Sequence, residues 1–451
     1  MKRIAIIFLI LFSLLLVFSS CGGEISTDSE TQTETATATE TAAESETDTQ
    51  TEEISPVKLT IDKDASVRGE ISFDIEIDGL SGEYSLIYAD REGKALPYFS
   101  NIKSGTLASC ISACNIVLSR DVGGLLLNVN EESYFLEIPN EYLLDDGYRF
   151  SALSDVHFNK GDYFTLALDF LDSQGIDFVG VSGDLSGNGE LEYLEKFNEA
   201  IKNRLYKVYT TSGNHDEAAV QSGLWKETIN TTITTDNEVV NIAKNGLDFV
   251  YKPTKMGEGV FIFLCQTHWL YPDKADPTEY TILDKEQLDW LKGVLEEYKD
   301  ENVFLFFHTF LTAPGGDETS AVGNLQNPGG YKYPLSYTYG SSDEIEFRAL
   351  MKEYKNVIYF SGHSHWMFEM ETYNENINFY NFDGEYGYMV HVPSVCEPRW
   401  IGENDEGRTS KTGDASEGWI VEVYNEAIVF IPVDFISRVY YTEYMEIIPL
   451  H

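Results

Sequence analysis

The stretch YRFSALSDVH, residues 148–157, joins a largely apolar segment to an aspartate and a histidine that lie two residues apart. The first part of this stretch has the character of a buried strand, and Asp155 and His157 follow that strand directly. Residues 163–173 then place apolar side chains at the spacing of one helix face. A strand, a polar loop and a helix in this order predict a parallel α/β sheet whose ligands bind at the carboxyl ends of the strands.

The same rhythm continues along the chain, where apolar strands alternate with amphipathic helices. We expect further strands at 176–182, 206–210, 260–264, 303–307, 357–360, 387–392, 419–424 and 427–433. We expect further helices at 190–203, 284–298 and 343–354. Two stretches rich in Gly, Asn, Thr and Tyr, 218–258 and 311–342, are interpreted as long insertions. The alternation predicts a layered α/β domain over residues 148–451.

Polar clusters follow five of the predicted strands. They are Asp155 with His157, Gly183-Asp184, Gly213-Asn214-His215-Asp216, His308, and Gly362-His363-Ser364-His365. Each cluster alone is a weak signal, since a single histidine after a strand is more often a core residue. Together they place five of the eight histidines at the edge of the sheet where sites form. Carboxylate and imidazole ligands suit Zn, Fe or Mn, so the sequence predicts a metal site.

This ordered set resembles the calcineurin-like metallophosphoesterases over residues 148–395. The resemblance implies a layered α/β/β/α sandwich and two divalent metal ions, such as Mn, Fe or Zn. It assigns one ion to Asp155, His157 and His365, the other to Asn214, His308 and His363, and the bridging position to Asp184. It also implies that His215 contacts the phosphate and protonates the leaving oxygen, with Asn214 beside it as a substrate-binding residue.

The chemistry implied by the resemblance is the hydrolysis of a small phosphate ester, either a phosphodiester or a phosphomonoester. A hydroxide that bridges the two ions would attack phosphorus in line with the leaving group, so no covalent enzyme intermediate is needed. The alternative is a non-catalytic surface lipoprotein that keeps the fold as a binding module. The complete set of metal ligands argues against this alternative.

Two positions depart from well-known branches of the family. Purple acid phosphatases have a tyrosine three residues after the bridging aspartate, and here that residue is Gly187. Protein Ser/Thr phosphatases have Asp-Arg-Gly in this loop and a glutamate after the catalytic histidine, whereas this chain has Gly-Asn-Gly and Asp216. The loop therefore lacks the acid that would orient His215, and what orients this ring is left open. Asp216 would instead bind backbone groups or a neighbouring ligand.

The N-terminus has the features of a targeting segment. A short basic start and an apolar run too short for the bilayer core predict a secretory signal peptide over residues 1–20. Small residues before Cys21 resemble a bacterial lipoprotein processing site, although Phe18 stands where that pattern usually has Leu. Residues 21–56 are rich in Ser, Thr and Glu and predict a disordered tether. We expect an exported protein with a lipid anchor at Cys21 on the outer face of the bacterial cytoplasmic membrane; an ordinary cleaved signal is the alternative.

Residues 57–147 predict a small all-β, sandwich-like domain that precedes the α/β domain. Alternating segments at 57–62, 71–77 and 84–88 are separated by turns that contain glycine. This region contains no histidine, and we assign no chemistry to it. Cys110 and Cys114 could form a disulfide in an exported protein, while their pairing is weak evidence for zinc.

The charge of the chain limits its partners. It has 75 Asp and Glu residues against 31 Lys and Arg, a formal net charge of −44, which argues against a nucleic-acid scaffold. Such a charge leaves room for metal ions that hold a small anionic substrate, and the sequence indicates no protein partner. His268 and the tyrosine-rich segment 331–339 could line a substrate pocket or lie at the surface. His391 and Cys265 are expected to be structural.

Overall fold

The computed structural model describes residues 55–145, 147–231, 233–268, 282–311, 342–372, 378–381, 384–401 and 408–450. The chain divides into two compact units, Met1–Ile54 and Ser55–His451, and the description below concerns the second. The predicted signal peptide, Cys21 and nearly all of the predicted tether lie outside the described residues, as does the segment 331–339. Within the described ranges, no helix combines the length and the apolar character needed to span a membrane.

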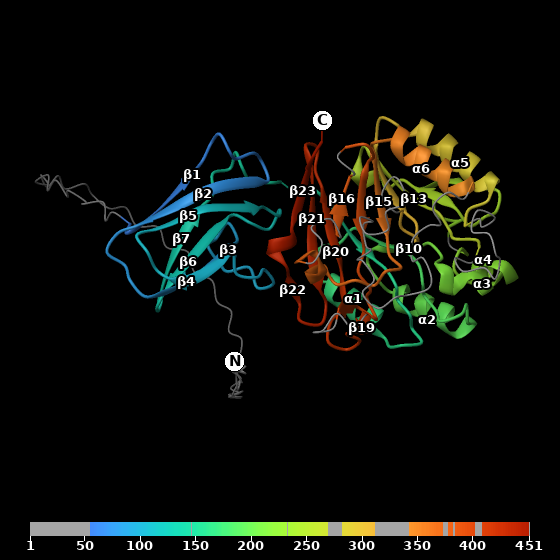
Figure 1. The fold of residues 1–451 in the computed structure, drawn as a ribbon, viewed down its shortest axis with the longest axis horizontal. Coiled ribbons are helices and arrows are strands. Elements are labelled where there is room, and N and C mark those ends of the chain that lie inside the picture. Colours follow the sequence, from blue (N-terminus) through green and yellow to red (C-terminus); the bar gives the residue numbers. More distant parts are fainter. Residues whose placement is uncertain are drawn as a thin grey trace, which may run out of the picture. The chain divides into compact units, whose positions relative to one another are not determined.

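The region before residue 148 is a β sandwich, as the alternating pattern predicts (Figure 1). One antiparallel sheet has the order β1 (Val57–Ile61), β2 (Glu70–Ile77) and β5 (Cys110–Val117). The other has the order β4 (Lys103–Thr106), β3 (Glu83–Ala89), β6 (Gly124–Val129) and β7 (Glu132–Glu137). In β2, alternate apolar side chains from Ile71 to Ile77 are buried and pack against inward side chains of the second sheet.

The first sheet of the α/β domain has the strand order β10-β9-β8-β20-β21-β22, and β23 also pairs with β21. Its strands are β8 (Tyr148–Leu153), β9 (Phe178–Val181), β10 (Lys207–Thr210), β20 (Glu417–Val423), β21 (Ala427–Asp434), β22 (Val439–Tyr440) and β23 (Glu446–Pro449). β8, β9 and β10 run parallel, so their carboxyl ends lie at one edge of this sheet.

The second sheet of this domain has the order β11-β12-β13-β14-β15-β17-β16. Its strands are β11 (Val239–Ile242), β12 (Phe249–Tyr251), β13 (Gly259–Phe263), β14 (Asn302–Phe306), β15 (Val357–Ser361), β16 (Phe379–Tyr380) and β17 (Tyr388–His391). β13, β14, β15 and β17 are parallel, and their side chains are almost all buried, as expected for a sheet covered on both faces. A two-stranded sheet of β18 (Arg399–Ile401) and β19 (Arg408–Ser410) follows.

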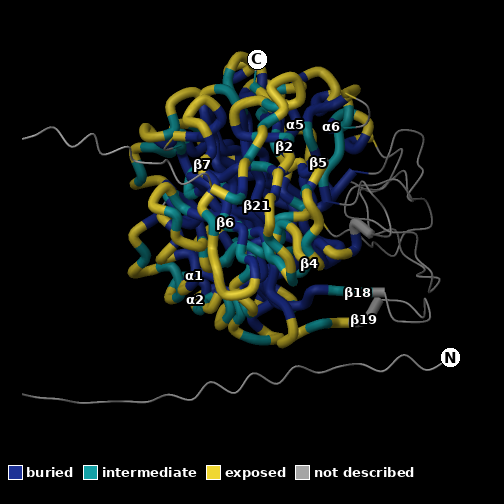
Figure 2. Tube along the Cα trace, turned by 90° about the vertical axis from the view of Figure 1, so that its left-hand side faces the viewer, coloured by how far each residue is buried: buried dark blue, intermediate teal, exposed yellow. Residues whose placement is uncertain are grey.

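The two sheets pack face to face with helices on their outer sides. Aromatic side chains fill the space between the sheets, where Phe306 stacks against Phe263 and Phe360 at ring distances of 5.1 and 4.9 Å. Helices α1 (Tyr163–Leu171) and α2 (Leu191–Ile201) cover the first sheet, and α5 (Lys285–Glu297) and α6 (Ser342–Glu353) cover the second. The buried residues run through the interior while exposed residues lie on loops and outer helix faces (Figure 2). This is the α/β/β/α sandwich that the sequence predicts.

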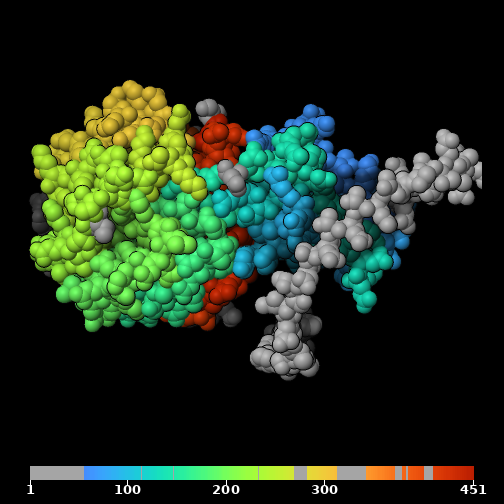
Figure 3. Space-filling view, turned by 180° about the vertical axis from the view of Figure 1, so that it is seen from behind, coloured from blue at the N-terminus to red at the C-terminus, as the bar shows by residue number. Residues whose placement is uncertain are grey.

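One expectation about the chain's organisation is wrong. The stretch 218–258 is not simply an insertion, because it contains β11 and β12, which extend the second sheet next to β13. It also contains α3 (Glu217–Ser222, which begins just before it) and α4 (Leu224–Thr228). These elements are three to six residues long, too short to give a periodic signal. The green to yellow part of the space-filling view, which includes this stretch, forms a continuous surface (Figure 3).

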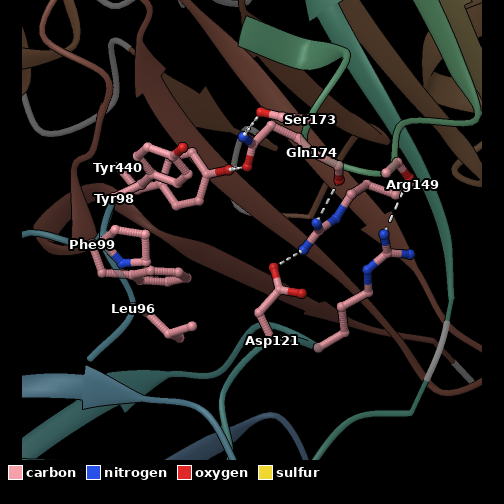
Figure 4. Close-up of a pocket in the computed structure, with 11 residues that line it drawn as sticks. Leu96, Tyr98, Phe99, Asp121, Arg149, Ser173, Gln174 and Tyr440 are labelled. Carbon is pink, nitrogen blue, oxygen red and sulfur yellow. Dashed lines mark hydrogen bonds and ion pairs between the residues drawn. The ribbon is translucent and has the colours of Figure 1, made fainter. Parts of the chain in front are cut away.

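A buried ion-pair network joins the β sandwich to the first sheet of the α/β domain (Figure 4). Arg149 of β8 is 2 % exposed and donates to Glu422 of β20, which is fully buried, through Nε at 2.8 Å and through a second nitrogen. It also donates to Asp121 at 2.5 Å and to the Gln174 carbonyl at 2.8 Å. A cavity of about 350 Å³ opens beside this network, lined in part by Tyr440. Removing one partner would leave a buried charge uncompensated.

The described cysteines are all free thiols, so Cys110 and Cys114 do not form the disulfide considered from the sequence. Both lie on β5, and Cys114 is buried in the core of the sandwich. Cys265 is fully buried just after β13, in agreement with the core position expected for it.

Candidate metal centre

The strand ends of both sheets converge on one polar cluster. Asp155 follows β8, Asp184 follows β9 and Asn214 follows β10, whereas His308 follows β14 and His363 follows β15. The cluster is buried despite its polarity. The exposed fractions are Asp155 0 %, His157 3 %, Asp184 0 %, Asn214 2 %, His308 0 %, His363 6 % and His365 6 %. The structure thus brings together all seven side chains that the sequence analysis names as metal ligands.

These side chains form two groups that could each hold a metal ion. The first ligand group is Asp155, His157, Asp184 and His365, and the second ligand group is Asp184, His308 and His363. Within each group the ligand atoms all lie within 4.8 Å of one another. Asp184 belongs to both groups. Its Oδ2 lies 3.6 Å from His157 Nε2 and 3.2 Å from His308 Nε2.

Asn214 lies at the second ligand group, because its Oδ1 is 3.1 Å from His308 Nε2. His363 reaches the same nitrogen with Nδ1 at 3.3 Å. On the other side, His365 Nε2 lies 3.1 Å from Asp155 Oδ1. Carboxylate, imidazole and amide oxygen donors at these separations are the donor types that Zn, Fe and Mn accept.

Backbone carbonyls fix the orientation of three of the ligand rings. His157 Nδ1 donates to the Ser186 carbonyl at 3.1 Å, and His365 Nδ1 donates to the Glu397 carbonyl at 3.0 Å. His308 Nδ1 likewise donates to the Ser182 carbonyl at 2.6 Å. Because a carbonyl can only accept, each Nδ1 carries a hydrogen, and the Nε2 atom faces the cluster. This is the arrangement in which a second hydrogen bond orients a metal-binding imidazole.

The facing nitrogens indicate that a cation fits between them. His157 Nε2 and His365 Nε2 lie only 3.3 Å apart, and both are lone-pair atoms when their Nδ1 atoms carry the hydrogens. Asp184 Oδ2 is buried, and among the described residues it has no hydrogen-bond partner while His308 Nε2, 3.2 Å away, is unprotonated. A metal ion would satisfy both features, since it accepts electron density from imidazole nitrogens and carboxylate oxygens at once.

The electrostatics of the cluster also favour positive charge. Burial raises the pKa of the Asp155 carboxyl, but the neighbouring His365 ring outweighs this and the pKa lies well below its usual range. The pKa of Asp184 is also lowered, because His308 and His215 outweigh the effect of burial. Burial lowers the pKa of His157 to about 4, whereas beside Asp184 the pKa of His308 rises to about 9 in spite of burial. Ionised carboxylates therefore attract positive charge into the cluster.

The backbone of the ligand loops is strained. Among the described residues, seven that are not glycine have positive φ, and five of these are Asp155, His157, Asp184, His363 and His365. Each such position costs roughly 1–3 kcal/mol and persists where its surroundings fix it, which happens mostly at functional sites. Backbone strain is therefore concentrated at five of the seven predicted ligands, which supports their assignment by an independent observation.

Two motif glycines are needed because the backbone comes so close to the carboxylates. A Cβ at Gly213 would lie 2.1 Å from Asp184 Oδ1, and a Cβ at Gly362 would lie 2.6 Å from Asp155 Oδ2. These contacts explain why the sequence has glycine directly before Asn214 and His363.

The structure shows what orients His215. Its Nδ1 donates to the Gly187 carbonyl at 2.8 Å, and its ring centroid lies 5.0 Å from that of His157. Burial lowers the pKa of His215, but Asp184 and the Gly187 carbonyl raise it more, so the net shift is upward. A Cβ at residue 187 would lie 2.7 Å from Asn159 Nδ2, so the Asn159 side chain would have to shift to admit it.

Asp216 binds backbone groups, which is one of the two roles open to it from the sequence. Its carboxylate accepts from the amides of Leu185 at 3.1 Å, Ser186 at 3.2 Å and Gly213 at 3.1 Å. It therefore ties together the loops that carry Asp184 and Asn214. Burial raises its pKa to about 6.

Other histidines named from the sequence have different surroundings. His268 is exposed, and its carbonyl accepts from Gln266 Nε2 at 2.9 Å; the segment after it lies outside the described residues. His391 is fully buried, and its Nε2 donates to the Trp366 carbonyl at 2.9 Å, as expected for a structural residue. His391 also packs against the loop that carries His363 and His365, because its Nε2 lies 3.4 Å from Ser364 Oγ.

Sequence reasoning missed the groups that hold the ligand rings. The carbonyls of Ser182, Ser186, Gly187 and Glu397 are backbone atoms, so no residue type marks them. The Glu397 side chain is also part of this surrounding layer. Burial raises its pKa, but the neighbouring Arg399 outweighs this, and the pKa falls to about 2.

Residues 148–367 match the family described as calcineurin-like phosphoesterase. The match covers just under half of the chain, and all of it lies in the α/β domain. The family and the buried Asp and His cluster together indicate metal-dependent hydrolysis of phosphate esters. No curated protein matches the chain.

Several solved structures are similar to the chain. Purple acid phosphatase PPD1 from yellow lupin seeds is 14 % identical with a TM-score of 0.41, and the match covers 87 % of this chain and 74 % of that one. TT1561 of Thermus thermophilus is 12 % identical with a TM-score of 0.34, covering 59 % and 99 %. The phosphopantetheinyl hydrolase PptH from Mycobacterium tuberculosis is 14 % identical with a TM-score of 0.32, covering 56 % and 91 %.

Proposed function

We propose that this protein is an exported, lipid-anchored phosphoesterase that uses two divalent metal ions to hydrolyse a small phosphate ester at the cell surface. The observation that carries the proposal is the position of Asp184. Its buried Oδ2 lies 3.6 Å from His157 Nε2 in the first ligand group and 3.2 Å from His308 Nε2 in the second. Such an oxygen is suited to bridge two ions.

The residues that would hold the ions are those of the two ligand groups, with Asn214 added to the second. Ions held there would supply a more acidic water as the nucleophile and would offset the negative charge of the phosphate oxygens. The loop backbone contributes rigidity, because strained φ values and carbonyl anchors leave the ligand side chains little freedom. Positioning of this kind lowers the activation free energy, because the ligand side chains need not rearrange during the reaction.

His215 is the residue of this chain that would move a proton. Its Nδ1 hydrogen is held by the Gly187 carbonyl, so Nε2 would carry the proton that passes to the leaving oxygen. The residue is partly buried beside His157, which places it next to the cluster and within reach of solvent. Asn214, the preceding residue, would contact the phosphate as well as the second ligand group.

The substrate is proposed to be a small anionic ester, since the chain has a net charge of −44 and would repel a polyanion outside the metal centre. The location is proposed from the apolar run of residues 4–18 and the small residues that precede Cys21. Membrane fractionation of the C21S variant tests the anchor. Release of the variant into the soluble fraction supports the proposal, and unchanged membrane retention contradicts it.

The activity is tested on the chain from residue 55 onward, stripped of metal and then supplied with Mn²⁺, Fe²⁺ or Zn²⁺. Hydrolysis of bis(p-nitrophenyl) phosphate is compared with that of p-nitrophenyl phosphate, with elemental analysis on the same sample. Metal-dependent cleavage of either ester supports the proposal, and the ratio ranks diesterase against monoesterase. Absence of both bound metal and turnover under all conditions contradicts it and favours the binding module.

A further inference from the structure

Residues 394–399, with the sequence SVCEPR, follow β17 and lie beyond the family-matched region. This segment runs beside the loops that carry Asp155 and His365. Ser394 pairs with Ser154 in an isolated parallel bridge, directly before Asp155. Further along, the Arg399 amide donates to the His365 carbonyl at 2.7 Å.

The hydroxyl of Ser394 is a junction between this segment and the first ligand group. Ser394 is fully buried, and its Oγ donates to the Asp155 carbonyl at 3.0 Å. The same oxygen accepts from the Cys396 amide at 3.2 Å and the Glu397 amide at 2.8 Å. One hydroxyl therefore ties the backbone of one metal ligand to the turn that ends at Glu397.

Glu397 extends this connection to a second ligand. Its carbonyl accepts from His365 Nδ1 at 3.0 Å and so fixes the ring of His365. Its carboxylate is held in turn by Arg399 at 2.9 Å and Lys160 at 3.3 Å. The position of this carbonyl therefore depends on the Ser394 hydroxyl and on two ion pairs.

We propose that Ser394 and Glu397 are positioning residues of the metal centre, which set the metal affinity of the first ligand group. Their contacts reach Asp155 and His365, both members of that group. His308 of the second ligand group takes its anchor from a different element, the Ser182 carbonyl after β9. The inference rests on the proposed function, because it requires both groups to bind metal. Loss of a residue that hydrogen-bonds to a metal ligand lowers the metal affinity roughly 10–100-fold.

The test is the S394A variant of the chain from residue 55 onward, compared with wild type by calorimetric titration of the metal-free proteins with Mn²⁺. We expect two classes of binding in wild type. In S394A one class weakens roughly 10–100-fold while the other changes little. S394T keeps the hydroxyl and restores the weakened class.

S151A is the matched control. Ser151 of β8 is also fully buried, and its Oγ donates to the Trp419 carbonyl at 2.8 Å, so S151A removes the hydroxyl of a buried serine and this hydrogen bond away from the cluster. We expect S151A to titrate like wild type. If S394A does not fold, R399M is tested in its place. This variant removes the ion pair between Arg399, whose side chain is partly exposed, and the Glu397 carboxylate. It should weaken metal binding in the same class.

The outcomes separate the two proposals. If wild type binds two ions and S394A, or R399M in its place, titrates like S151A, the inference is wrong and the proposed function stands. Equal weakening of both classes also overturns the inference, because it indicates a general loss of structure. If wild type binds no Mn²⁺, Fe²⁺ or Zn²⁺, the proposed function fails and the inference fails with it.

Discussion

Replacing Gly362 by alanine would test how closely the ligand loops are packed. A Cβ at this position would lie 1.7 Å from Ser154 Oγ and 2.6 Å from Asp155 Oδ2, whereas ordinary contacts begin at 3.4 Å. The carboxylate of Asp155 would therefore have to retreat by the difference between 3.4 and 2.6 Å, about 0.8 Å. That carboxylate also accepts from the His363 amide at 3.0 Å, so the two loops would shift together.

The expected effect of G362A is larger on the metal centre than on the fold. A displacement of about 1 Å at a catalytic group costs on the order of 100-fold in turnover. Overpacking a buried site costs about 1–3 kcal/mol in the free energy of unfolding. We expect a lowered urea midpoint, weaker Mn²⁺ binding, and a kcat/KM reduced about 100-fold on whichever p-nitrophenyl ester wild type cleaves.

The control is G293A, because a Cβ at Gly293 in α5 meets nothing within 4 Å. Alanine in a helix interior should leave metal binding unchanged and raise stability by up to about 1 kcal/mol. The double variant G362A/S154G removes the Ser154 side chain but keeps the contact with Asp155, so it should recover stability without recovering metal affinity. Normal metal affinity and turnover in G362A would refute the account of why the motif has glycine here.

H215A should retain both ions and lose roughly 10²–10⁴-fold in kcat, the range of general acids; elemental analysis beside kinetics checks this, and loss of metal would contradict the assigned role. R149M should destabilise the protein by about 3–5 kcal/mol, because it leaves the buried Glu422 carboxylate unpaired, and R149M/E422L should recover much of that loss in urea unfolding. Burial raises the pKa of Glu417 to about 8 from 4.5, so the folded state keeps a proton that the unfolded state releases. Stability should therefore fall as pH rises from 4.5 to 8, and E417Q should flatten the pH dependence of the urea midpoint; an unchanged slope in E417Q would contradict this.

Much of the fold can be predicted from local patterns in the sequence. Apolar, regular strands precede Asp155, Asp184 and His308. Parallel strands bring their carboxyl ends to one edge of a sheet, so the position of these residues can be predicted. The helix at α5 is marked by its cap, where Asp284 accepts from the Gln287 amide at 2.8 Å. The short strands β11 and β12 could not be predicted in this way. Their pairing with β13 is decided by tertiary contacts rather than by local periodicity.

The candidate site also has a part that the sequence predicts and a part that it does not. Side-chain ligands can be named from residue types and spacing, and the structure brings those seven together. The backbone carbonyls that fix the rings have no residue signature, so the anchor of His215 at Gly187 could be found only in three dimensions. Ser394 is another such case, since nothing in its type or neighbours distinguishes it from an ordinary buried serine.

The central claim is that Asp184 bridges two ions. The most direct test is the metal content of wild type and D184N, measured on the same samples as ester hydrolysis. Asparagine keeps the size of the side chain but removes the charge that both ligand groups share. We predict two ions per chain and metal-dependent turnover in wild type, with lost occupancy and abolished turnover in D184N. Two bound ions and full activity in D184N would contradict the account.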